Sequence, residues 1–222
     1  MSRALTAGRG LAGLTLTLTL TGLALLALAL TGFALTGFVP QTGGVGSPVA
    51  DFRLRGVNNR VVSLASYPAA RGFIVVFTCN HCPFARLYTA RLNALNAKYQ
   101  AQQVPLLAIN SMDTVVYAEE SFRLMQQRAG AEQFTFPYLH DARQAVGRDF
   151  RAEHTPQTYV IWKEDGQWKI RYSGAVDDNG AEPGQVKNVY VAQAVDALLA
   201  GKPVANPKTE SFGCAIFFRK KL

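Results

Sequence analysis

Two cysteines separated by two residues are the part of this sequence best suited to chemistry. Cys79 and Cys82 lie in "FIVVFTCNHCPFARLY", with Asn80 and His81 between them. A thiol pair at this spacing can form a redox-active disulfide, supply half of a metal site, make a structural bridge or act as a peroxidase centre. The rest of the chain has to distinguish these four kinds of site.

The segments on either side of the pair predict a strand followed by a helix. The run "GFIVVFT" is apolar and rich in β-branched residues, as in a central strand covered on both faces. The segment "PFARLYTARLNALNAKYQ" has apolar residues among polar ones and predicts an amphipathic helix. Cys79 is then expected at the helix N-terminus, where free N–H groups and the helix dipole lower a thiol pKa.

The neighbours of Cys79 fit this arrangement. Cys82 would lie one helical turn later, close enough to close a disulfide or to resolve a mixed one. A protonated His81 would stabilise the Cys79 thiolate further. Pro83 suits the first turn of a helix, because its missing N–H is not needed there.

The remaining pattern predicts strands that alternate with helices. Such alternation is typical of an α/β sandwich, and a hairpin near the end would make its sheet mixed. The expected elements are two short strands in 51–67, a buried strand in 104–110, helices in 115–130, 142–150 and 186–201, and a hairpin in 157–174 that turns at Glu164-Asp165-Gly166.

The first forty residues differ in composition from the rest. Residues 10–48 form an uncharged run. This run is longer than the apolar part of a secretory signal and long enough for a helix that spans a membrane. We therefore expect 1–40 to be an uncleaved membrane anchor rather than a cleaved signal, and carbonate extraction of membranes would distinguish the two. Residues 41–48, rich in glycine, form a linker, and 49–222 form the folded domain.

Charge and export narrow the classes of partner. The formal net charge is +8, but Lys and Arg are scattered, so we expect no nucleic-acid partner. Arg3 and Arg9 precede the uncharged run, and the positive-inside rule places the domain beyond the cytoplasm. The expected site is the periplasmic side of a bacterial inner membrane, or the periplasm itself, where disulfides can persist.

A second motif, read together with the cysteine pair, resembles a known protein family. The order "FTCNHCPF" followed by "HTPQTYVI" resembles the thioredoxin superfamily. More narrowly, "ADFRLRG", "VVSL", "GAVDDN" and a terminal "GCAI" resemble its exported or membrane-anchored redoxin branch, AhpC/TSA-like, over 49–221. The resemblance implies a thioredoxin-like mixed sheet flanked by helices, with an N-terminal hairpin and a helical insertion. It also implies that Thr155 and a cis Pro156 lie against the cysteines and shape a groove for the partner's backbone.

The peroxidase and metal alternatives receive less support. Peroxiredoxins have a threonine or serine three residues before the reactive cysteine and a proline four residues earlier, where this chain has Val76 and Gly72. One cysteine pair supplies two ligands, and a structural zinc site usually takes four. A copper-delivery role through Cys79, Cys82 and a distant histidine stays open. His140 and His154 are expected to be ordinary surface or capping residues.

Several further residues remain open. Cys214 is by default a buried inert thiol, with a third redox thiol as the functional alternative. Asp177 and Asp178 are expected to act in turns and caps. The position six residues before Cys79, which is acidic in thioredoxin, holds Phe73, so Glu153 and Asp178 are the candidates for assisting deprotonation of Cys82.

The combined prediction is a thiol–disulfide oxidoreductase that acts on protein thiols and disulfides. Cys79 would attack, Cys82 would resolve, and Asn80 and His81 would tune the potential. We expect no cofactor besides the redox-active disulfide, no bound metal, and a membrane or soluble electron-transfer partner. The direction of electron flow, the substrate and the oligomeric state stay open.

Overall fold

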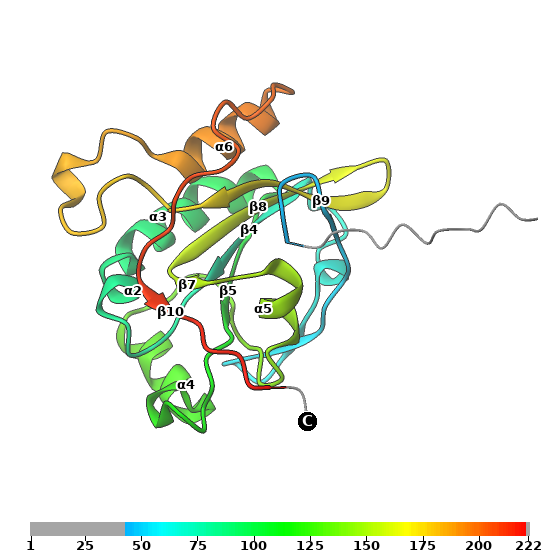
Figure 1. Ribbon diagram of the computed structural model, residues 1–222. Coiled ribbons are helices and arrows are strands. Elements are labelled where there is room, and N and C mark those ends of the chain that lie inside the picture. The colour runs from blue at the N-terminus through cyan, green and yellow to red at the C-terminus, as the bar shows by residue number, and fades with distance from the viewer. Residues whose placement is uncertain (1–42, 221–222) are drawn as a thin grey trace, which may run out of the picture. The chain divides into compact units, whose positions relative to one another are not determined.

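A computed structural model describes residues 43–220. The expected anchor, 1–40, lies outside the described residues, and none of the helices within 43–220 is long and apolar enough to cross a membrane. The described chain is a mixed α/β fold built around a curled sheet (Figure 1). This confirms the thioredoxin-like fold class that the resemblance implied.

The central sheet has eight strands in the order β1-β9-β8-β4-β5-β6-β2-β3. β4 pairs in parallel with β5, β5 pairs in parallel with β6, and β8 and β9 join antiparallel, so the sheet is mixed as expected. The strands are β1 (Pro48–Val49), β2 (Leu54–Gly56), β3 (Val61–Val62), β4 (Gly72–Phe77), β5 (Leu106–Asn110), β6 (Tyr138–His140), β8 (Gln157–Glu164) and β9 (Gln167–Gly174).

The predicted central strand is β4, and all six of its residues are buried. Its side chains alternate between two apolar clusters, one on each face of the sheet. Phe73, Val75 and Phe77 pack on one face, and Ile74 and Val76 pack on the other. Burial on both faces explains why the segment reads as a continuous apolar run.

Helices cover both faces of the sheet. Helix α5 contributes to the cluster of Phe77, whereas α3, α4 and α6 contribute to the cluster of Val76. The α-helices are α2 (Pro83–Leu87), α3 (Thr89–Tyr99), α4 (Phe122–Ala131), α5 (Ala145–Phe150) and α6 (Tyr190–Leu199), and short 3-10 turns lie at Leu64–Ser66, Gln100–Gln102, Ala118–Glu120 and Pro183–Gln185.

The predicted hairpins are present. β2 and β3 form the N-terminal hairpin, and β8 and β9 form the long one. Asp165 and Gly166 both have positive φ, +51° and +77°, as the tight turn between β8 and β9 requires. Gly46 donates its N–H to Ile170 in β9, so the end of the expected linker lies against the sheet.

Two predicted helices are wrong at their boundaries. The one expected in 115–130 is a 3-10 turn, Ala118–Glu120, followed by α4, which begins only at Phe122. The segment from Pro83 to Tyr99 forms two helices, α2 and α3, which meet at Tyr88. The first helix begins at Pro83, and Cys82 is its N-cap. Proline suits that first position, as expected, but Cys79 lies three residues before the N-cap and therefore outside the helix.

The C-terminal segment returns to the middle of the domain. Strand β10 (Cys214–Ala215) pairs antiparallel with β7 (His154–Thr155) in a separate two-stranded sheet. Figure 1 shows this segment in red, crossing beside β7 and the start of α2. The tail therefore lies next to both sequence motifs.

Candidate active site

The two motifs meet at one point. The Thr155–Pro156 peptide bond is cis, as the resemblance implied. Cys79 Sγ lies 3.0 Å from Thr155 Oγ1, and Cys82 Sγ donates to the Thr155 carbonyl oxygen at 3.1 Å. Both cysteines therefore contact the residue that precedes the proline, although 73 or more positions separate them from it in the chain.

Cys214 joins the pair from the C-terminal strand. The register of β10 places Cys214 opposite Thr155. Its backbone N–H points to Cys82 Sγ at 3.4 Å, and its thiol also interacts with Cys82. The site thus holds all three cysteines of the chain, each as a free thiol.

The cysteine pair is closed off from solvent. Cys79 and Cys82 both have 0% of their surface exposed. Cys214 is half-buried and lies on β10, where it is paired with Thr155 of β7. A partner protein can reach the two sulfurs only after a covering segment moves aside.

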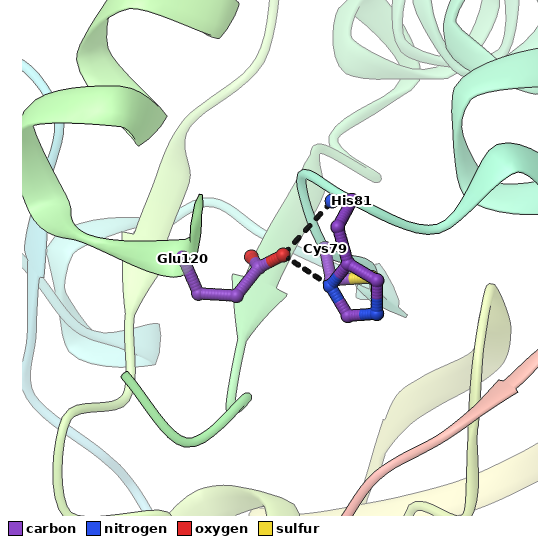
Figure 2. Close-up of side chains that lie close together, drawn as sticks. All are labelled: Cys79, His81 and Glu120. Atoms are coloured by element: carbon purple, nitrogen blue, oxygen red, sulfur yellow. Dashed lines mark hydrogen bonds and ion pairs between the residues drawn. The ribbon is translucent and has the colours of Figure 1, made fainter. Parts of the chain in front are cut away.

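A buried carboxylate, Glu120, organises the backbone between the cysteines. Figure 2 shows Glu120 facing Cys79 and His81, which belong to a separate part of the chain. Glu120 is 0% exposed and accepts the N–H groups of Asn80 and His81 at 2.8 and 2.9 Å. It also binds Asn110 Nδ2 at 2.6 Å and lies 2.7 Å from His81 Nδ1.

The residues between the cysteines are held from several sides. Asn80 is buried; its amide nitrogen donates to the Glu119 carbonyl at 2.7 Å, and its oxygen accepts from Tyr138 at 3.0 Å. His81 stacks on Tyr117 with ring centroids 4.5 Å apart. Its outer side lines an open pocket of about 420 Å³, so His81 is the part of the motif nearest to solvent.

The charges around the pair differ from the sequence expectation. A hydrogen bond to Cys82, burial and the negative charge of Glu120 all raise the pKa of Cys79. The same hydrogen bond lowers the pKa of Cys82 against the cost of its burial, and Cys214 and the Ala85 N–H add to this lowering. The helix start acts on Cys82, because Cys82 rather than Cys79 is the N-cap of α2.

The acidic candidates from the sequence are not at the cysteines. Glu153 is exposed, and Asp178 accepts the backbone N–H groups of Lys187 and Asn188, so it holds the loop before α6 and does not cap that helix, whose N-cap is Val189. The carboxylate that acts on Cys79 is Glu120. No pattern marks Glu120 in the sequence, because it follows Glu119 in a polar segment and only the 3-10 turn directs one of the two inward.

The other polar residues singled out by sequence have structural surroundings. Asp177 is buried and binds Arg91 at 2.7 Å and Tyr88 at 2.9 Å, which ties α3 to the loop after β9. His140 lies against the ring of Phe122, and burial lowers its pKa. His154 lies in β7, 3.5 Å from the Ser211 hydroxyl.

Three side chains could offer ligand atoms to a metal ion. Within residues 43–220, Cys79, His81 and Glu120 place one donor atom each within 4.8 Å of one another. Glu120 already accepts from two backbone N–H groups, Asn110 and the His81 ring. Its oxygens are therefore occupied by the protein itself, and the arrangement fits a structural carboxylate better than a metal ligand.

A comparison with models of protein families identifies the family of this chain. The model of the AhpC/TSA family matches residues 45–173, which include both cysteines of the pair and the cis-proline. The chain belongs to the AhpC/TSA family. No match is found among curated protein sequences.

Solved structures place this AhpC/TSA chain among thioredoxin-fold proteins. A hypothetical protein from Sinorhizobium meliloti 1021 is 31% identical, with a TM-score of 0.72 over 82% of this chain and 98% of that one. The peroxidoxin BcpB from Mycobacterium tuberculosis is 16% identical, with a TM-score of 0.52 over 71% and 94%. A putative thiol:disulfide interchange protein DsbE from Chlorobium tepidum is 20% identical, with a TM-score of 0.51 over 72% and 99%. The chain is therefore a thioredoxin-fold member of a redox family.

Proposed function

We propose that the protein is a thiol–disulfide oxidoreductase that acts on protein disulfides or dithiols through Cys79 and Cys82. The observation that carries this proposal is the contact of both sulfurs with Thr155, next to the cis Pro156. The cysteine pair and the groove residues are thus assembled at one place in a redox-family fold. The disulfide itself is the only redox group that the reaction needs.

The proposed exchange transfers two electrons through a mixed disulfide. One thiolate of the pair attacks a sulfur of the substrate disulfide, forms a new S–S bond and releases a substrate thiolate. The second cysteine then attacks the mixed disulfide, closes the Cys79–Cys82 bond and releases the other substrate sulfur. The pair is oxidised and the substrate is reduced to a dithiol, which takes one proton from the second cysteine of the pair and one from solvent.

The surroundings of the cysteines favour exchange over peroxide reduction. Val76 stands where a peroxiredoxin would have a threonine or serine, and Gly72 stands where it would have a proline. Both residues are buried in β4. The Trp162 ring packs so closely against Gly72 that a Cβ at position 72 would lie 2.2 Å from it. Neither residue offers a side-chain donor for a peroxide oxygen.

We further propose that the domain works outside the cytoplasm, with a membrane or soluble protein as its electron-transfer partner. The uncharged run in residues 10–48 supports export. An exported compartment would let the disulfide form of the pair persist.

Reduction of insulin by dithiothreitol, followed with and without the protein, tests the proposed activity. We expect the wild type to accelerate reduction and both Cys79→Ser and Cys82→Ser to lose the acceleration. A mixed disulfide with insulin accumulates in the variant that keeps the attacking sulfur. This is Cys82→Ser if Cys79 attacks, as the sequence predicts, and Cys79→Ser if Cys82 attacks, which is the thiolate that the surroundings of the pair favour. Equal rates for wild type and both variants, with no trapped adduct, would exclude the proposed function.

A further inference from the structure

The third cysteine lies where a partner's chain would bind. β10 pairs antiparallel with β7, and Cys214 is opposite Thr155, the residue before the cis-proline. The groove that the family resemblance assigns to a partner's backbone is therefore occupied by this chain's own tail. A cysteine of that tail has its N–H 3.4 Å from Cys82 Sγ.

The tail is shaped for this position. Gly213 has φ +147°, and a Cβ on it would lie 2.1 Å from the Thr155 carbonyl oxygen, so a residue with a side chain does not fit. Ile216 is buried and donates its N–H to the Glu153 carbonyl at 2.8 Å. Gln144 binds the Phe217 carbonyl at 2.9 Å and the Arg219 N–H at 2.8 Å. The close approach of Gly213 to Thr155 before Cys214 and the hydrogen bonds after it thus hold Cys214 beside Cys82.

We propose that Cys214 is a third redox thiol, which exchanges a disulfide with Cys82 inside the protein. This inference rests on the proposed function, because that activity supplies the oxidised Cys79–Cys82 pair. The Cys214 thiolate attacks Cys82 Sγ, a Cys82–Cys214 bond forms, and the Cys79–Cys82 bond breaks. Cys79 leaves as a thiolate and takes up the proton that Cys214 gave, so the protein keeps the same number of electrons.

The electrostatics allow the exchange to run in that direction. In the reduced site, burial and the neighbouring Cys82 raise the pKa of Cys214 to about 12. When Cys82 enters a disulfide its charge is lost, and that contribution to the Cys214 pKa disappears with it. Burial and Glu120 favour the protonated form of Cys79, which suits it to receive the proton. The oxidised protein would then exist in two interconverting forms, one with a Cys79–Cys82 disulfide and one with a Cys82–Cys214 disulfide.

Peptide mapping of the oxidised protein tests this exchange. The full-length protein is oxidised with diamide, quenched with acid, alkylated with N-ethylmaleimide and digested with trypsin. Cys79 and Cys82 share the tryptic peptide 72–86, whereas Cys214 lies in 209–219. A Cys79–Cys82 disulfide leaves 72–86 as a single peptide with an internal disulfide and no alkylated cysteine, and a Cys82–Cys214 disulfide joins the two peptides with Cys79 alkylated.

We expect the joined pair in the wild type, a higher yield of it in Cys79→Ser, and its loss in Cys82→Ser. The control is the double variant Cys214→Ala/Ala215→Cys, which moves the thiol to the adjacent, exposed position of β10. This control should give no joined pair. Absence of the joined pair from both wild type and Cys79→Ser, or an equal yield in the control, would overturn the proposal.

The insulin assay separates this inference from the proposed function. Insulin reduction by a protein that never forms the joined peptides would contradict the third-thiol proposal and leave the oxidoreductase intact. Joined peptides in a protein that does not accelerate insulin reduction would contradict the proposed substrate class, while internal exchange would stand.

Discussion

At the scale of single residues, Glu120 matters most among those that the sequence did not mark. It is fully buried, and it binds the two backbone N–H groups between the cysteines and the side chain of Asn110. Its charge also opposes ionisation of Cys79. One carboxylate thereby shapes the loop and biases the thiolate toward Cys82.

We predict that Glu120→Gln lowers the free energy of unfolding by about 2 to 4 kcal/mol, because an amide replaces one acceptor oxygen with a donor facing other donors. Urea denaturation measures the change. Glu119→Gln is the matched control, since Glu119 is the exposed neighbour and should change stability by less than about 0.5 kcal/mol. Equal losses in the two variants would contradict the assigned role of Glu120.

The sequence predicts the residues of this site that stand in recognisable motifs, but it does not predict the contacts of Glu120 and Cys214 with the pair. The cysteine pair, Pro83 and Thr155-Pro156 stand in short segments whose residue types indicate their role. Glu120 and Cys214 reach the pair only by folding, from 40 and 132 residues away. The sequence expectation that Cys79 lies at the helix start failed because the helix begins at Pro83.

At the scale of elements, β10 decides access to the cysteines. β4 and the start of α2 hold the pair from within, as the buried apolar run predicted. β10 closes the pair from outside through two residue pairs with β7. A strand this short opens far more readily than the central sheet, so access depends on a local equilibrium.

We predict that Gly213→Ala raises the rate at which Cys79 and Cys82 react with Ellman's reagent. The new Cβ would collide with the Thr155 carbonyl, and a strain of about 1 to 3 kcal/mol favours the open tail by about tenfold for every 1.4 kcal/mol. Gly130→Ala is the control, since a Cβ there meets nothing within 4 Å. A Gly213→Ala rate no higher than this control would show that β10 does not limit access.

At the scale of the whole molecule, a mixed sheet with a closed thiol cluster is combined with an N-terminal segment of different composition. The alternation of strands and helices was readable from the sequence because each element carries its own apolar period. The break at Tyr88 and the return of the tail were not, since they depend on packing between distant segments. Anchoring of 1–40 stays a prediction.

The measurement that tests the central claim most directly is the reduction potential of the Cys79–Cys82 couple. The protein is equilibrated in glutathione buffers of graded ratio, and its thiols are then alkylated and counted by mass spectrometry. We predict reversible two-electron oxidation with a midpoint between about −270 and −120 mV, the span of thioredoxin-fold oxidoreductases. A pair that stays fully reduced in every buffer would contradict the claim that these cysteines form a redox couple.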